Sequence, residues 1–95
     1  MNPDQAKELN HLLLRTGAHL DQSVAFVKDC DSEENFLGYR EVVGELMGSL
    51  LCDALRPLWQ RFPELLPDYL DGPYKVPVSV YQPAFHPPVP ESPAD

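Results

Sequence analysis

Two apolar repeats of similar length, separated by an acidic corner, most constrain what this chain can fold into. In the first half, apolar or small residues occupy two positions of a seven-residue repeat: Ala6, Leu13, Leu20 and Val27 at one, and Leu9, Thr16, Ser23 and Cys30 at the other. In the second half the repeat is formed by Phe36, Tyr39, Val43, Leu46 and Leu50. Such repeats are typical of one face of a long helix. The sequence therefore predicts two amphipathic helices.

The first helix is predicted over residues 3–28. Asn2 suits the N-cap, and Pro3 suits the first helical position, where its missing N–H costs least. The helix is expected to end near Lys28, because Asp29 would place a negative charge against the negative end of the helix dipole.

The second helix is predicted over residues 33–56. Asp31 or Ser32 can cap it, and the two glutamates that follow favour its first turn. Pro57 is expected to interrupt it, since proline lacks the backbone donor and its ring clashes with the preceding turn. A connection this short makes neighbouring helices antiparallel, so the fold class predicted is an all-α helical hairpin.

The hairpin also bears on the two cysteines. With the corner near residue 31, Cys30 and Cys52 are expected about 30 Å apart along the helix axis. A disulfide needs alpha carbons within about 7 Å. Two free thiols are therefore predicted, which fits a reducing compartment.

The C-terminal part of the chain carries a different signal. Residues 57–70 keep an apolar face and are predicted to form short helical turns, which completes a helical domain over residues 1–72. Residues 73–95 contain seven prolines and are predicted to be an extended tail, either polyproline-like or with a brief strand over 76–81. The alternative is that residues 73–86 pack along the helices and enlarge the core.

Two helices in contact bury only one side of each, so much apolar surface is left over. The simplest closed solution is a homodimer that forms a four-helix bundle. Glycines four residues apart in the second helix would permit close helix approach. The interface is expected to include Leu13, Leu20, Phe26, Val27, Phe36, Val43, Gly44, Met47, Gly48, Leu50, Trp59 and Phe62.

Charge limits the other partners. The formal net charge of -8 repels phosphate backbones and anionic lipid, so neither direct nucleic-acid binding nor membrane binding is expected. The chain has no apolar run of the roughly 18 to 20 residues that a membrane span needs. The N-terminus does not resemble a secretory signal, and a cytoplasmic location is expected.

The metal candidates are weak. Glu8 and His11 have the Glu-x-x-His spacing of helical bundles that hold two metal ions, and Asp53 is expected at a similar level of the hairpin. The other carboxylates of such a site are missing. A calcium loop beginning at Asp29 fails, because Glu34 stands where the turn needs glycine and Arg40 where it needs a bidentate glutamate. No metal or other cofactor is expected.

No arrangement of nucleophile, base and acid is recognisable, so the chain is not expected to be an enzyme. The sequence favours a non-enzymatic protein–protein interaction module: a homodimeric helical scaffold, adaptor or regulator. One alternative is a helical bundle that binds a metal or a small ligand. Another is an acidic decoy that inhibits a nucleic-acid-binding protein.

Overall fold

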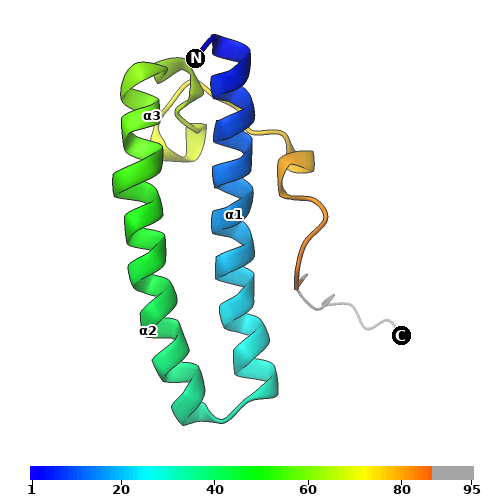
Figure 1. The fold of residues 1–95 in the computed structure, drawn as a ribbon. Helices are drawn as coiled ribbons and strands as arrows, with labels where there is room; N and C mark the ends of the chain where they lie inside the picture. The colour runs from blue at the N-terminus through cyan, green and yellow to red at the C-terminus, as the bar shows by residue number, and fades with distance from the viewer. Residues whose placement is uncertain (87–95) are drawn as a thin grey trace, which may run out of the picture.

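The structure is a computed structural model that describes residues 1–86. Within this range the chain is mostly helical and has no strand, which confirms the predicted all-α class. Figure 1 shows two long helices, α1 and α2, side by side and in opposite directions, with the N-terminus beside the short helix α3. The last nine residues of the predicted tail lie outside the described residues.

Helix α1 spans Pro3–Cys30. It begins as predicted, with a capping box in which the Gln5 N–H donates to Asn2 Oδ1 over 2.8 Å and the Asn2 N–H donates to Gln5 Oε1 over 2.9 Å. The predicted end at residue 28 is wrong by two residues. The cap residue Asp31 donates its N–H to the Val27 carbonyl, and Lys28 supplies a cation in the last turn, so the helix tolerates the acidic residue between them.

Only two residues connect α1 to α2. Ser32 Oγ accepts the Asn35 N–H over 3.2 Å and so caps α2, which spans Glu33–Ser49. The Asp31 carboxylate accepts the Ser32 N–H over 2.7 Å and the Asn35 Nδ2–H over 3.1 Å. The bond from the Asn35 side chain, and after it the bond from the Ser32 N–H, lower the pKa of Asp31. The acidic corner thus organises the turn with its own side chains.

The predicted end of the second helix at residue 56 is wrong, because the helical path continues past Pro57. After α2 comes one widened π-helical turn, η1 (Leu50–Leu55), and then α3 (Arg56–Arg61). The Arg56 N–H donates to the Leu51 carbonyl, five residues back rather than four. The proline follows in the first turn of α3, where a missing N–H is tolerated.

After α3 the chain folds back over the end of the helix pair in two 3₁₀ turns, η2 (Pro63–Leu65) and η3 (Asp68–Leu70). The Tyr74 N–H donates to the Leu66 carbonyl over 3.0 Å, and the Asp68 N–H donates to the Tyr74 carbonyl over 2.8 Å. These bonds close a compact loop. Gly72 is required within it, since a Cβ there would collide with the backbone of Leu66.

Residues 74–86 lie along α1. This agrees with the alternative prediction, in which residues 73–86 pack along the helices. The strand considered for 76–81 is absent, and a 3₁₀ turn, η4 (Val78–Tyr81), stands there. Arg15 Nε donates to the Val80 carbonyl over 2.8 Å, and Gln22 Oε1 accepts the Phe85 and His86 N–H groups over 2.6 and 3.0 Å. Side chains of α1 thus hold the segment along most of its length.

The core lies at the end of the helix pair that holds α3. Its buried apolar side chains form one cluster: Ala6, Leu14, Leu55, Leu58, Trp59, Leu65 and Val80. Asn10 is also fully buried. Its Oδ1 accepts the Trp59 Nε1–H over 2.9 Å, and its Nδ2–H donates to the Leu65 carbonyl over 3.3 Å. One amide therefore joins α1, α3 and η2 across the core.

Candidate interaction groove

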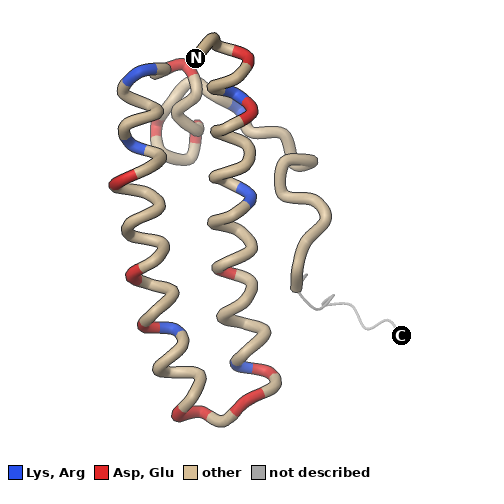
Figure 2. The backbone as a smooth tube through the Cα atoms, in the orientation of Figure 1, with Lys and Arg blue, Asp and Glu red and all other residues tan. Residues whose placement is uncertain are grey.

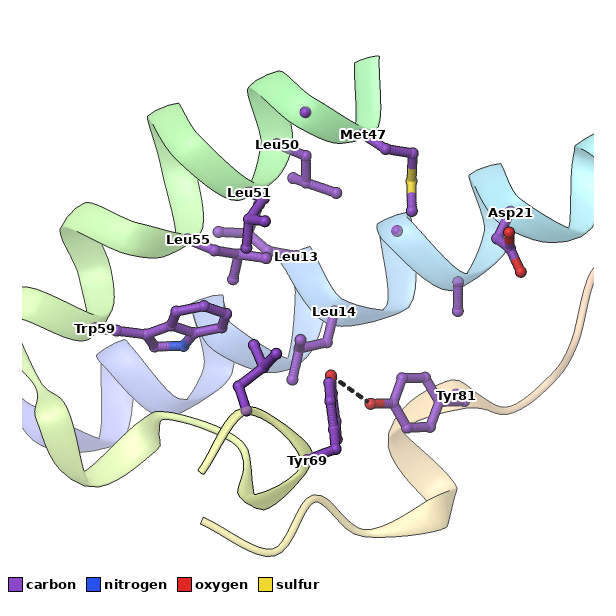
Figure 3. Close-up of a pocket in the computed structure, with 14 residues that line it drawn as sticks. Leu13, Leu14, Asp21, Met47, Leu50, Leu51, Leu55, Trp59, Tyr69 and Tyr81 are labelled. Atoms are coloured by element: carbon purple, nitrogen blue, oxygen red, sulfur yellow. Dashed lines mark hydrogen bonds between the residues drawn. The ribbon is translucent and has the colours of Figure 1, made fainter. Parts of the chain in front are cut away.

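An apolar groove runs between α1 and the helix formed by α2 and η1 (Figure 3). Its volume is about 530 Å³, within the range of sites that bind organic ligands or anchoring side chains. Most of its lining is aliphatic or aromatic, and one carboxylate, Asp21, lies on it. The lining residues are Leu13, Leu14, Gly17, Ala18, Asp21, Met47, Gly48, Leu50, Leu51, Leu55, Trp59, Tyr69, Leu70 and Tyr81.

The floor of the groove depends on two packing devices. A Cβ placed on Gly17 would lie 3.2 Å from Leu50 Cδ2, so the absence of a side chain lets η1 approach α1 closely. Farther along, the indole of Trp59 is held by its bond to the buried Asn10. Leu55, also buried, packs beside it. The floor is therefore fixed by the core rather than by the groove's own surface.

Two tyrosines form the edge of the groove nearest the C-terminal segment. The hydroxyls of Tyr69 and Tyr81 lie 3.4 Å apart, as the dashed line in Figure 3 marks. Burial, then the bond to Tyr69, then the charge of Asp68 raise the pKa of Tyr81. Tyr81 thus presents a neutral hydroxyl beside an otherwise apolar surface.

The middle of the helix pair, where Asp21 lies on the groove, is acidic. Residues 16–27 and 41–55 contain four acidic residues, Asp21, Glu41, Glu45 and Asp53, and no Lys or Arg. The basic side chains lie outside these two ranges, and one of them, Arg56, shares a depression with Leu51, Trp59 and Leu70 at the α3 end of the groove. They are Lys7, Arg15, Lys28, Arg40, Arg56, Arg61 and Lys75. Figure 2 shows red segments on the central part of both helices, with a blue segment at each border of this part.

The predicted interface residues fall into three groups. Val43 and Trp59 are buried within the chain, and the residues partly buried by it are Leu13, Leu20, Val27, Phe36, Met47, Leu50 and Phe62. Phe26, Gly44 and Gly48 are exposed. Phe26 nevertheless stacks edge-on against Phe85, with ring centroids 5.3 Å apart. Five of the predicted residues, Leu13, Met47, Gly48, Leu50 and Trp59, line the groove.

The two glycines singled out in the second helix do not serve close packing within the chain. A Cβ on either Gly44 or Gly48 would meet nothing within 4 Å. The close approach occurs at Gly17 instead. Gly48 lines the groove, and Gly44 lies one turn away on the same helix, so both leave their helix surface open to solvent.

Several groove residues were missed by the heptad reading. The buried residues of α1 are Ala6, which belongs to the predicted repeat, and Asn10, Leu14 and Gly17, which do not; together they form one stripe. Its signal is the spacing of four, four and three residues, which is as helical as the heptad but includes a polar residue and a glycine. Tyr69, Leu70 and Tyr81 enter through the fold of the C-terminal segment, for which the sequence offers no comparable signal.

A second exposed apolar surface lies along the other side of the helix pair. Thr16, Leu20, Ser23 and Tyr39 line a shallow depression there, and Ser23 Oγ and the Tyr39 hydroxyl are hydrogen bonded over 2.8 Å. Val42 and Leu46 follow Tyr39 by three and seven residues, so they extend the same side of α2. They are 55% and 49% exposed. We name Thr16, Leu20, Ser23, Tyr39, Val42 and Leu46, none of them charged, the neutral face. His19 and Phe85 also line the depression and are not included in this name.

The metal candidates are not brought together. His11 Nε2 is hydrogen bonded to the Tyr74 hydroxyl over 2.7 Å, and burial, followed by the charges of Lys7 and Arg15, lowers the pKa of His11. In residues 1–86 no group of three or more acidic, histidine or cysteine side chains is placed to hold a metal ion. Cys30 and Cys52 are free and exposed.

Comparisons of the chain with protein-family models, with curated proteins and with solved structures give no match. Among the residues that the structure describes, no helix combines the length and the apolar character that a membrane span requires.

Proposed function

We propose that this chain is a non-enzymatic protein–protein interaction module, a helical scaffold or adaptor that works in the cytoplasm as a homodimer. The observation that carries the proposal is that both long sides of the helix pair expose apolar side chains, in the groove on one side and on the neutral face on the other. Apolar surface of this extent on a small domain usually marks a contact with another protein.

The neutral face is the side that suits a second copy. Each copy carries a net charge of -8, so two copies repel, and the repulsion is smallest where the contact surfaces bring no carboxylates together. Thr16, Leu20 and Ser23 of α1 and Val42 and Leu46 of α2 meet that condition. Two-fold pairing of this face would stack two helix pairs into a four-helix bundle.

Sedimentation velocity at micromolar concentrations tests the proposal. The wild-type chain is expected to sediment as a dimer, and Leu46→Glu is expected to give a folded monomer, because it places two like charges at the contact. Leu37→Glu is the matched control, since Leu37 is similarly exposed on α2 but outside the neutral face. A wild-type chain that is monomeric and shows the circular dichroism of a folded helical protein would contradict the dimer. An equal effect of Leu46→Glu and Leu37→Glu would also contradict it.

A further inference from the structure

No segment of residues 1–86 fills the groove. The shape and the charge of the groove indicate what kind of partner could occupy it. Resting on the proposed interaction function, we propose that the groove binds a cationic amphipathic helix of another protein. The apolar side of that helix would lie on Leu51, Leu55 and Trp59, and its Lys or Arg side chains would face Asp21 and Glu41.

The shape of the groove favours a helix. It lies along two antiparallel helices that are side by side, so an elongated occupant can contact both over several turns (Figure 3). Apolar residues spaced three, four and seven apart on one helix face are the usual anchors in such grooves. Leu51 and Leu55, one turn apart in η1, are spaced to interdigitate with them.

Small side chains allow a third backbone to come near. Ala18 of α1 and Gly48 of α2 both line the groove, and Gly44 lies one turn from Gly48 toward the corner. A Cβ on either glycine would meet nothing within 4 Å, so the space above them is open in this chain. A helix seated there would bury backbone that is otherwise left to solvent.

Charge identifies the kind of helix. Asp21 is the one charged side chain in the groove lining, and Glu41 lies one turn beyond Gly44 on the side of α2 that carries Gly48. A partner with Lys or Arg along its polar side would be attracted from a distance and aligned on contact. A second copy of this chain would bring carboxylates instead. Residues 87–95 contain Glu91 and Asp95 and no basic residue, so their charge is also of the wrong sign.

The test uses the full-length chain and a synthetic peptide of about 18 residues, long enough for five helical turns. Leucines at helical spacing form one face of the peptide and lysines the other. Trp59, the only tryptophan of the chain, lines the groove, so its fluorescence reports binding at that place. The expected result is saturable binding with a change in Trp59 emission. Weakening of the binding by salt is also expected.

Two control peptides separate the contributions of charge and shape. A peptide with glutamate in place of lysine is expected not to bind. A scrambled leucine–lysine peptide of the same composition has no apolar face and is expected to bind at least about tenfold more weakly. Equal binding of the ordered and scrambled peptides would overturn the proposal, because charge alone would then explain the attraction.

Matched variants place the binding in the groove. Gly48→Leu fills the groove and is expected to weaken binding by about tenfold or more. Gly38→Leu makes the same change at a helical glycine with open space around it and outside the groove lining, and is expected to bind normally. Asp21→Asn is expected to weaken binding by a few fold and to reduce its dependence on salt. Equal affinities for all three variants would overturn the proposal.

Failure of this inference differs from failure of the proposed function. If Gly48→Leu converts a wild-type dimer to a monomer, the groove is the site of self-association; the cationic-helix proposal is then overturned and the interaction function retained. If the wild type is a dimer that Leu46→Glu dissociates and no peptide binds, the cationic-helix proposal is likewise overturned and the interaction function is retained. Peptide binding by a monomer would support the groove and overturn the homodimer.

Discussion

The two ends of the helix pair have the same kind of sequence repeat and very different burial. At the end that holds α3, Leu14 and Trp59 lie in a core closed by η2 and by the C-terminal segment. Toward the corner, no residue from Ala18 to Val42 is buried. The difference shows that two helices cannot bury their own apolar stripes, and that burial begins where a third layer covers the pair.

The sharpest test of this difference is to truncate one aromatic side chain at each end. Trp59→Ala is expected to lower the free energy of unfolding by about 3–5 kcal/mol, because it opens a cavity and leaves Asn10 without its donor. Phe36→Ala, near the corner, is expected to cost about 1 kcal/mol, since its ring is only partly buried. Urea unfolding followed by circular dichroism at one fixed protein concentration measures both. Similar losses would contradict the contrast between the two ends.

The next largest effect is expected at a buried amide. Asn10→Ala leaves the Trp59 indole N–H and the Leu65 carbonyl without their partner, and is expected to cost about 1–3 kcal/mol. Asn35→Ala is the control at the corner, where the side chain bonds only to the exposed Asp31 and the expected cost is within about 0.5 kcal/mol. Thermal unfolding of the two variants ranks them. A larger loss for Asn35→Ala would mean that the corner, not the core, sets the stability.

A cap at the corner is expected to have a local effect. Ser32→Ala removes the acceptor of the Asn35 N–H and is expected to cost about 1 kcal/mol. Hydrogen exchange should quicken in the first turn of α2 while the amides of Pro3–Gly17 keep their protection, because the weakly buried end opens on its own. Ser32→Asp restores an acceptor and should restore the protection. Uniform loss of protection along the chain would show that the two ends unfold together.

The smallest effect is a pH dependence at the covered end. Burial and two nearby cations lower the pKa of His11 below 6.5, so folding favours its neutral form. This contribution is complete above the unfolded pKa and is lost as the pH falls through the lowered value of the folded state. His11→Gln keeps an acceptor for Tyr74 without titrating. The wild type should therefore lose more stability than His11→Gln between pH 7 and pH 5, by less than about 1 kcal/mol because His11 is partly exposed. Parallel pH profiles would contradict this.

The sequence predicts the helix starts well and the helix ends poorly. Asn2 and Ser32 cap α1 and α2 as their residue types indicate, because capping is a local interaction within one turn. The ends depend on more distant compensation. Lys28 offsets Asp29, and the widened turn of η1 carries the helix past Pro57. The predicted ends rested on Asp29 and on Pro57 alone, and neither residue by itself indicates the compensating interaction.

The groove was predictable only in part. Leu13 and Leu50 belong to the apolar repeats, and these two residues and Met47 were expected at an interface. Tyr69 and Tyr81 reach the groove because residues 66–81 fold back and are held by bonds to residues more than fifty positions away, such as Arg15 to the Val80 carbonyl. Periodicity reports which residues share a helix face. It does not report which non-helical segment covers that face.

The π-helical turn has a consequence for everything that follows it in the chain. It accommodates one more residue than an α-helical turn, and one residue corresponds to about 100° of rotation around the helix axis. In an unbroken α-helix Trp59 would point away from Asn10 by roughly that angle, and its indole N–H would not reach the Asn10 side chain. The single additional residue in Leu50–Leu55 thus rotates the helix that follows it. The rotation directs the indole of Trp59 into the core, and the indole in turn determines the position of the groove floor.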